Sequence, residues 1–300
     1  MTTTAGAPSS YTCRWCNTTS TGQAPSCPGC GAPVDIRARV TDSGWVELPP
    51  IKDMARIQFG QSSAQVAGTW VPSVDMNLAP GDSVYFSHHV LLWQDMSVQL
   101  GTQPMRGAWS RMMAGMPLIM MEAAGPGHIA FSYDAPGEVV AVPLHPGAAI
   151  EVRENHFLVA TAAVTYDWEQ SGVWFTTGSG DDTEWHYPVG RYIDRFYAQS
   201  GTPGLVFLHA RGNSFVRTLR PGETILVKPP SLLYKDPTVR MQLHVEYPRS
   251  GVRFWRSWGN RYLWLRLWGP GRVAVQSAYE HMEDPGSGFT STSGHTEFAW

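Results

Sequence analysis

A pattern centred on the dipeptide Pro-Gly occurs three times along this chain and restricts its fold more than any other feature. The copies read LAPG (78–81), LHPG (144–147) and LRPG (219–222). Counted from the proline of each copy, positions 4, 6, 11 to 13, 18 and 20 are apolar in all three. A second mark, GPG or GTPG, follows at 125–127, 201–204 and 269–271, with apolar residues two and four positions later. The sequence therefore predicts three tandem copies of one structural unit.

Each copy has the pattern of β-strands joined by turns. Apolar residues two positions apart mark one face of a half-buried strand, while Pro-Gly favours a tight turn. The copies start 66 and 75 residues apart, which is longer than the unit of a solenoid, and the sequence shows no long amphipathic helix. We therefore predict an all-β fold in which three pseudo-repeats close into a compact β-prism or barrel-like body around a pseudo-threefold axis.

The four cysteines of the chain lie together near its N-terminus. Cys13, Cys16, Cys27 and Cys30 form two C-x2-C pairs. Two such pairs supply the four thiolates of a tetrahedral, structural Zn2+ site. The alternative, a redox-active dithiol, lacks the surrounding βαβ pattern. We predict a zinc ribbon whose closed site leaves no zinc-bound water for catalysis; whether the ribbon only folds itself or also grips a partner stays open.

Composition narrows the class of protein and its location. The 300 residues are 43% hydrophobic and 16% charged, and the formal net charge of −3 argues against a dedicated nucleic-acid-binding protein. The N-terminus lacks the basic and apolar segments of a signal peptide. The longest apolar run, MPLIMM (116–121), is too short to cross a bilayer. We therefore expect a cytoplasmic protein without a transmembrane segment.

These marks also predict the domain boundaries. We expect disorder over 1–10, the zinc ribbon over 11–34, a linker or first strand over 35–54, the three-repeat β domain over 55–280 and a flexible tail over 281–300. The tail is rich in Gly, Ser and Thr, which favours disorder, yet it ends with Phe298, Ala299 and Trp300. Two aromatic side chains on a flexible tether suit docking into an apolar groove on a neighbouring molecule, with an unused tail as the alternative.

Three stretches resemble a known family. They read SRMMAGMPLIMMEAAGPGHIAFS (110–132), RPGETILVKPPSLLYKD (220–236) and GNRYLWLRLWGPGRVAVQS (259–277), and they are similar to the altered inheritance of mitochondria protein 24 family over about residues 55–278. The resemblance implies a compact all-β body of three pseudo-repeats, similar to the tryptophan-RNA-binding attenuation protein class. It brings no catalytic residues, and mitochondrial members are associated with inner-membrane organisation. The cysteine pairs and His88-His89 depart from the family pattern.

The sequence offers little for catalysis. It contains no G-x-S-x-G, P-loop or H-E-x-x-H motif. Metal binding by His88 and His89 is disfavoured, because adjacent residues of a strand face opposite sides. The acidic loop DDTEWH (181–186) lacks the ligand spacing of a calcium loop and is interpreted as a solvated loop tip. We predict that the protein is not an enzyme, with a metal-dependent β-barrel enzyme as an alternative.

Residues 262–268, YLWLRLW, predict an amphipathic strand near the end of the third repeat. Strand alternation places three leucines on one face and four larger side chains on the other, namely Tyr262, Trp264, Arg266 and Trp268. A row of aromatic side chains exposed to water is rarely tolerated, so we predict a subunit or partner interface here. The alternatives are tryptophans within the core, anionic lipid and nucleic acid.

Together these features favour a non-catalytic binding or scaffold protein that forms a homo-oligomer, holds a protein partner, or both. A structural zinc that grips a partner fits this function. The alternative is a binder of nucleic acid or of an anionic membrane surface, for which arginine among aromatic residues is also suited.

Overall fold

The computed structural model describes most of the chain, and it falls into two compact units, Met1–Glu47 and Leu48–Trp300. The described residues are 10–13, 18–21, 27–29, 43–47, 56–102, 120–177, 180–199, 201–246, 262–279 and 290–291.

The described residues of the first unit contain three short strands, β1 (Ser10–Thr12), β2 (Thr19–Thr21) and β3 (Val46–Glu47). β1 and β2 pair antiparallel, with Tyr11 opposite Ser20. At the end of β1 the backbone N–H of Cys13 donates to the carbonyl of Thr18 at 2.9 Å. The hairpin therefore holds the first cysteine at the end of a paired strand.

The second unit is built from strands, which confirms the all-β prediction. After β4 (Arg56–Phe59) and β5 (Ser62–Ala67), three repeats of six strands follow. Repeat 1 contains β6 (Ser73–Leu78), β7 (Ser83–Ser87), β8 (Leu91–Gln94), β9 (Gln99–Thr102), β10 (Met120–Ala124) and β11 (Gly127–Ser132). Repeat 2 contains β12 (Gly137–Leu144), β13 (Ala149–Arg153), β14 (Phe157–Thr161), β15 (Val164–Gln170), β18 (Tyr192–Ala198) and β19 (Gly204–Arg211). Repeat 3 contains β20 (Ser214–Leu219), β21 (Thr224–Val227), β22 (Leu232–Lys235), β23 (Arg240–Glu246), β24 (Tyr262–Trp268) and β25 (Gly271–Gln276).

The remaining elements are short. The described helices are the 3-10 turns η2 (His88–Val90), η3 (Gly180–Asp182) and η4 (Pro229–Ser231). β16 (Phe175–Thr177), β17 (Glu184–His186) and β26 (Thr290–Ser291) form a small separate sheet. β26 lies within the predicted tail, and it pairs with β16 so that Ser291 lies opposite Phe175.

The Pro-Gly dipeptides form the same turn in each repeat. A backbone N–H donates back across the turn to a carbonyl three residues earlier: Asp82 to Ala79 at 3.1 Å, Ala148 to His145 at 2.8 Å and Glu223 to Arg220 at 3.0 Å. The glycines take left-handed φ values, 88° at Gly81 and 79° at Gly147 and Gly222. Proline before a left-handed glycine is the requirement of a type II turn, so the turns that the sequence predicts are present.

Each repeat folds as two layers of three strands. One layer holds the first, sixth and third strands, giving the orders β6-β11-β8, β12-β19-β14 and β20-β25-β22. The other holds the second, fifth and fourth strands, giving β7-β10-β9, β13-β18-β15 and β21-β24-β23. Successive repeats join where β14 pairs with β7 and β22 pairs with β13. Within the second unit this gives two six-stranded runs, β12-β19-β14-β7-β10-β9 and β20-β25-β22-β13-β18-β15.

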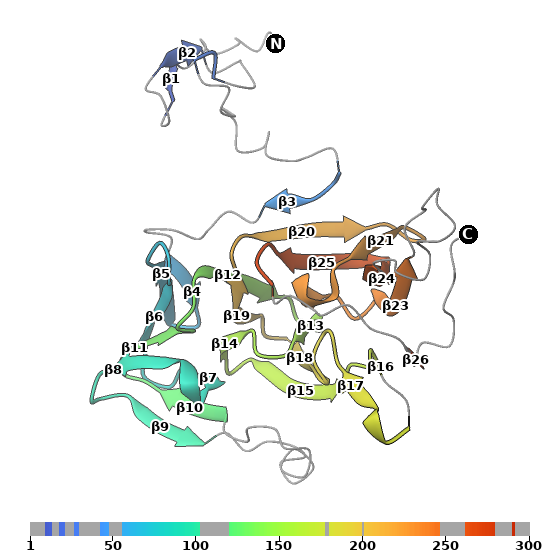
Figure 1. Ribbon diagram of the computed structural model, residues 1–300. Coiled ribbons are helices and arrows are strands. Elements are labelled where there is room, and N and C mark those ends of the chain that lie inside the picture. The colour runs from blue at the N-terminus through green and yellow to red at the C-terminus, as the bar shows by residue number, and fades with distance from the viewer. Residues whose placement is uncertain are drawn as a thin grey trace. The chain divides into compact units, whose positions relative to one another are not determined.

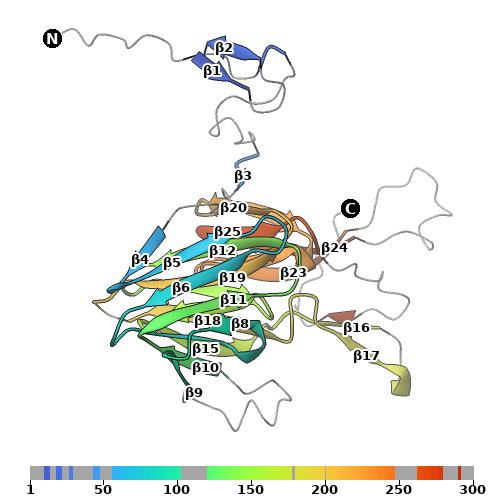
Figure 2. The same cartoon turned by 90° about the vertical axis from the view of Figure 1, so that its left-hand side faces the viewer.

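Strand pairing does not close the three repeats into a barrel among the described strands. A third six-stranded run would need β8 to pair with β21, but these strands are edges of two separate sheets, β4-β5-β6-β11-β8 and β21-β24-β23. Figures 1 and 2 show the sheets of the second unit from two directions. The structure thus confirms an all-β fold of three repeats, and its described strands do not form a closed barrel.

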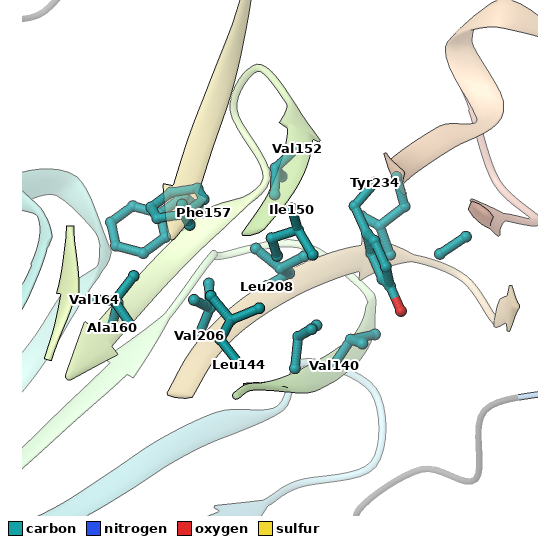
Figure 3. Packing of buried hydrophobic residues seen from close by; sticks show 14 of the residues in the cluster. Val140, Leu144, Ile150, Val152, Phe157, Ala160, Val164, Val206, Leu208 and Tyr234 are labelled. Carbon is teal, nitrogen blue, oxygen red and sulfur yellow. The ribbon is translucent and has the colours of Figure 1, made fainter. Parts of the chain in front are cut away.

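The core lies between these sheets in two clusters. One cluster fills the space between the two six-stranded runs, and Figure 3 shows Val206 and Leu208 of β19 gathered there with Ile150 of β13. The other lies between the β4-β5-β6-β11-β8 sheet and the β12-to-β9 run, where Phe86 meets Phe131 with ring centroids 4.8 Å apart. β14 has core on both faces, so all five of its residues are buried.

In every repeat, a side-chain oxygen accepts a hydrogen bond from the backbone N–H at the same position. The acceptor lies 15 positions after the Pro-Gly proline, and the donor is the N–H that follows the Gly-Pro-Gly or Gly-Thr-Pro-Gly mark. The bonds run from His128 to Asp95 at 2.9 Å, from Leu205 to Thr161 at 3.1 Å and from Arg272 to Asp236 at 2.8 Å. These shared contacts establish the three repeats as copies of one structure.

Candidate interaction surface

The sheet β21-β24-β23 presents the amphipathic strand predicted for residues 262–268. β24 is its central strand, with β21 and β23 antiparallel on either side. Leu263, Leu265 and Leu267 are buried, as strand alternation predicts, and Leu243 and Val245 of β23 are buried opposite them. The inner face of this sheet is therefore aliphatic and anchors the sheet to the body.

The opposite face carries Tyr262, Trp264, Arg266 and Trp268 of β24, which we call the aromatic face. Tyr262 is exposed and the other three are partly buried. The indole N–H of Trp264 donates to Glu246 Oε2 at 2.8 Å, and its ring stacks on Tyr262 with centroids 6.1 Å apart. These two contacts hold the Trp264 ring in one orientation.

Neighbouring strands extend the aromatic face with charged, polar and aliphatic side chains. On β23, His244 lies opposite Trp264, and Arg240 lies opposite Trp268. On β21, Leu226 lies opposite Arg266 and is exposed. The face therefore combines aromatic rings with charges of both signs, because Glu246 and Arg240 lie at its two ends.

A polar network lies buried at the junction between repeats 2 and 3. Lys235 Nζ donates to Glu151 Oε2 where β22 pairs with β13, and both side chains are buried. His156 is also buried; its Nδ1 lies 2.8 Å from the carbonyl of His209, and its Nε2 lies 3.2 Å from Arg153. Burial, followed by the charge of Arg153, lowers the pKa of His156 from 6.5 to about 3, so this imidazole is neutral near pH 7.

Sequence reasoning missed this network because it compared only apolar positions between the copies. The alignment of the three repeats nevertheless contains charged residues at two positions that face each other across a junction. Glu151 lies 5 positions after its Pro-Gly proline and Lys235 lies 14 positions after its own. At the first junction these two positions are Tyr85 and Ala160, which face each other across β7 and β14.

The adjacent histidines of repeat 1 are not a strand pair. His88 and His89 lie in the 3-10 turn η2, with ring centroids 5.8 Å apart in an edge-to-face arrangement. Burial and the neighbouring His88 lower the pKa of His89. The expectation that strand geometry separates the two rings was therefore wrong, because the chain turns between β7 and β8. Within the described ranges, no group of three or more His, Cys, Asp or Glu side chains is arranged to hold a metal ion.

The predicted zinc ligands are described only in part. Cys13 and Cys27 are both buried, and the N–H of Gly29 donates to Cys27 Sγ at 3.4 Å. Cys16 and Cys30 lie outside the described residues, as do Phe298 and Trp300 of the tail. Of the acidic loop, Asp181, Asp182 and Glu184 are exposed to solvent.

Comparison with known proteins identifies the family. The family described as Mitochondrial biogenesis AIM24 matches residues 64–278, which includes all three repeats. The chain belongs to the AIM24 family. A search of curated proteins found no match. Among solved structures, the crystal structure of protein SPYM3_0169 from Streptococcus pyogenes is similar, with a TM-score of 0.53 and 16% identity over 73% of this chain and 94% of that one. At this identity the likeness concerns the fold alone. No helix in the described part of this AIM24-family chain is long and apolar enough to span a bilayer.

Proposed function

We propose that this AIM24-family protein is a non-catalytic binding protein that presents its aromatic face to a protein partner. The observation that carries the proposal is the row of Tyr262, Trp264, Arg266 and Trp268 on a strand whose other face is anchored in the core. Such a row is held rigidly by the sheet but remains in contact with solvent. Tyr, Trp and Arg are the residue types that contribute most to protein–protein binding.

The arrangement of the aromatic face favours a protein over a polyanion. The Trp264–Glu246 hydrogen bond and the stacking of Tyr262 order two side chains in advance, which lowers the entropy lost on binding. Glu246 lies on the same face as Arg240 and Arg266, so the charges are mixed. A mixed rim around aromatic side chains resembles a protein interface, whereas phosphate groups select a uniformly basic surface.

The first unit fits a structural zinc site as the second part of this proposal. Cys13 and Cys27 are buried in a unit of only 47 residues, too few for a substantial hydrophobic core. An amide pointing at sulfur, as from Gly29 to Cys27, stabilises a thiolate ligand. With Cys16 and Cys30, these thiolates would complete a closed Zn2+ site that supplies folding energy to the unit and steadies it for gripping a partner.

The experiment compares two pairs of tryptophan substitutions in the full chain. Trp264→Ala with Trp268→Ala removes the centre of the aromatic face. Trp70→Ala with Trp185→Ala is the matched control, since both are exposed outside that face. We expect affinity capture to recover a protein with the wild type and the control, and to lose it at least tenfold with the first variant. Circular dichroism confirms that both variants remain folded.

Two results would contradict the proposal. If the aromatic-face variant captures the same proteins at the same yield, the partner binds elsewhere. If the wild type captures no protein but is retained on heparin or on vesicles of anionic lipid, in a way that salt abolishes and the variant lacks, the face binds phosphate-bearing ligands instead.

A further inference from the structure

The junctions between successive repeats follow one rule. The third strand of the later repeat pairs with the second strand of the earlier repeat, as β14 does with β7 and β22 with β13. The register is also the same. Position 5 of the earlier repeat lies opposite position 14 of the later one, giving Tyr85 opposite Ala160 and Glu151 opposite Lys235. One mode of association therefore relates repeat 1 to repeat 2 and repeat 2 to repeat 3.

The two ends of this series each leave one strand edge unused. β8 is the third strand of repeat 1, and no described strand precedes it in the way that β7 precedes β14. β21 is the second strand of repeat 3, and no described strand follows it in the way that β22 follows β13. Both are edge strands among the described sheets. Figure 1 shows them on opposite sides of the second unit.

Side chains on these edges are more exposed than their equivalents at the formed junctions. Leu92 and Trp93 of β8 are 58% and 44% exposed, whereas the residues at the same positions of β14 and β22 are at most 3% exposed. Leu226 of β21 is 41% exposed, whereas Tyr85 and Glu151 at the same position are 1% and 7% exposed. At the two ends of the series these apolar side chains are exposed, although the residues at the same positions of the formed junctions are buried.

Neither edge carries the features that prevent strands from pairing. β8 reads LLWQ and β21 reads TILV, without a charged residue or a proline, although exposed edges are commonly guarded by lysine or proline. The side-chain oxygen of Gln94, at position 14 of repeat 1, is buried with no hydrogen-bond partner in the described part of the chain. A buried polar atom of this kind is costly unless a partner supplies a donor.

We propose that β21 of one copy pairs with β8 of a second copy, head to tail, and continues the series of repeats. The register of the two internal junctions places Leu226 opposite Gln94 and Val227 opposite Trp93. The new junction buries Leu92, Trp93 and Leu226 as their equivalents are buried inside the chain. The backbone groups of both edges gain hydrogen bonds at the same time.

We assign a second copy of this chain to the free strand edges of the described sheets because the same kind of strand pairing already occurs at both junctions within each chain. Each copy carries both halves of the junction, one on repeat 1 and one on repeat 3, so the contact is heterologous. Heterologous contacts give a closed ring when their rotation closes and an open filament when it does not. The inference goes beyond the proposed function, since it uses the strand edges. It shares only Leu226 with the margin of the aromatic face and leaves Trp264 and Trp268 to a partner.

The test introduces one charge at each residue of the predicted pair, Leu226 and Gln94. The two charges copy the ion pair of the second junction. Leu226→Glu and Gln94→Lys each place one unpaired charge in the new interface, where burial without a partner is strongly destabilising. Together they recreate the pairing of Glu151 with Lys235. The control is Gln99→Lys, the same substitution on the exposed edge strand β9. Light scattering of the full-length proteins measures mass against the 33.1 kDa of one chain, and circular dichroism monitors the fold.

We expect the wild type and the control to assemble, and each single variant to fall to the mass of one chain with its fold intact. The double variant should assemble again. An equimolar mixture of the two single variants should also assemble, because the glutamate introduced in one copy then meets the lysine introduced in the other. A wild type of one chain at all concentrations would overturn the proposal. Single variants that still assemble, or a mixture that remains monomeric, would overturn it as well.

Discussion

Lys235 Nζ donates to Glu151 Oε2 across the junction between repeats 2 and 3, with both side chains buried and 84 residues apart in the sequence. The same two positions at the first junction hold Ala160 and Tyr85. The ion pair is therefore an addition to the shared junction and not a requirement of it. Its energetic effect depends on whether both partners are present.

Replacing one member of the ion pair is expected to destabilise the protein severely. Lys235→Met leaves a buried carboxylate without its cation, which costs about 3–5 kcal/mol of the free energy of unfolding. Lys235→Met with Glu151→Leu removes both charges and should recover most of that loss, because a buried ion pair and an apolar pair are often equal in stability. Urea unfolding of Lys235→Met, Glu151→Leu and the double variant, each against the wild type, measures these losses. Additive losses from the two substitutions would show that the residues do not act as a pair.

His156 should make the protein less stable in acid. The pKa of this histidine falls from 6.5 to about 3 on folding, so the unfolded chain binds the proton more readily than the folded one. The contribution of neutral His156 is full above pH 6.5 and decreases by about 1.4 kcal/mol per pH unit as the pH falls towards 3. His156→Gln removes the titrating group. Its urea-unfolding free energy should therefore depend less steeply on pH between about 6.5 and about 4, and an unchanged slope would refute the assignment.

Two glycines of the third repeat should differ in their tolerance of a methyl group. A Cβ at Gly222 meets nothing within 4 Å, so Gly222→Ala costs only the left-handed φ of 79°, about 1–2 kcal/mol. A Cβ at Gly269 would lie 2.5 Å from the carbonyl oxygen of Arg220, which the backbone must move to relieve. We expect Gly269→Ala to lower the unfolding free energy more than Gly222→Ala. Equal losses of unfolding free energy would mean that the backbone around Gly269 moves to accommodate the methyl group at little cost.

Loss of the predicted zinc should affect the stability of the two units differently. Elemental analysis of the purified protein should find one zinc per chain. Cys13→Ser with Cys16→Ser should release it and unfold the first unit alone, because the repeats provide the core of the second unit. The thermal transition of the β-sheet signal should remain. Loss of that signal in the double variant would show that zinc supports the body as well.

Local features of the fold follow from the sequence because they depend on neighbouring residues. The Pro-Gly turns are set by proline and a left-handed glycine within four residues, and the alternation of Leu263, Leu265 and Leu267 is set within one strand. Position 18 of each repeat, represented by Val98, Val164 and Val239, is buried in all three copies. Position 20 is not fully buried in any copy: Tyr166 and Met241 are partly buried, and Leu100 is exposed on β9, whose four residues are all exposed.

Features that depend on contacts between distant segments could not be predicted from the sequence. The threefold pattern favours closure, yet closure requires β8 to reach β21, which lies two repeats further along the chain, and no local signal decides this. The pairing of Glu151 with Lys235 likewise depends on which strands meet. At the candidate site, alternation predicted which side of β24 faces outward, but the fixing of Trp264 by Glu246 required the register of β23.

The shared register of the two junctions has a consequence for how such a chain can change in length. Each junction uses one strand from each of two repeats, and the end strands remain the same kind whatever the number of repeats between them. Duplication of the gene segment for residues 137–211 would therefore add a fourth unit by the same strand pairing, with Glu151 opposite Ala160 at the new junction, so that one further substitution would be needed there. Natural variation in this architecture can thus proceed by whole units, while insertions such as that carrying β16 and β17 accumulate in the loops.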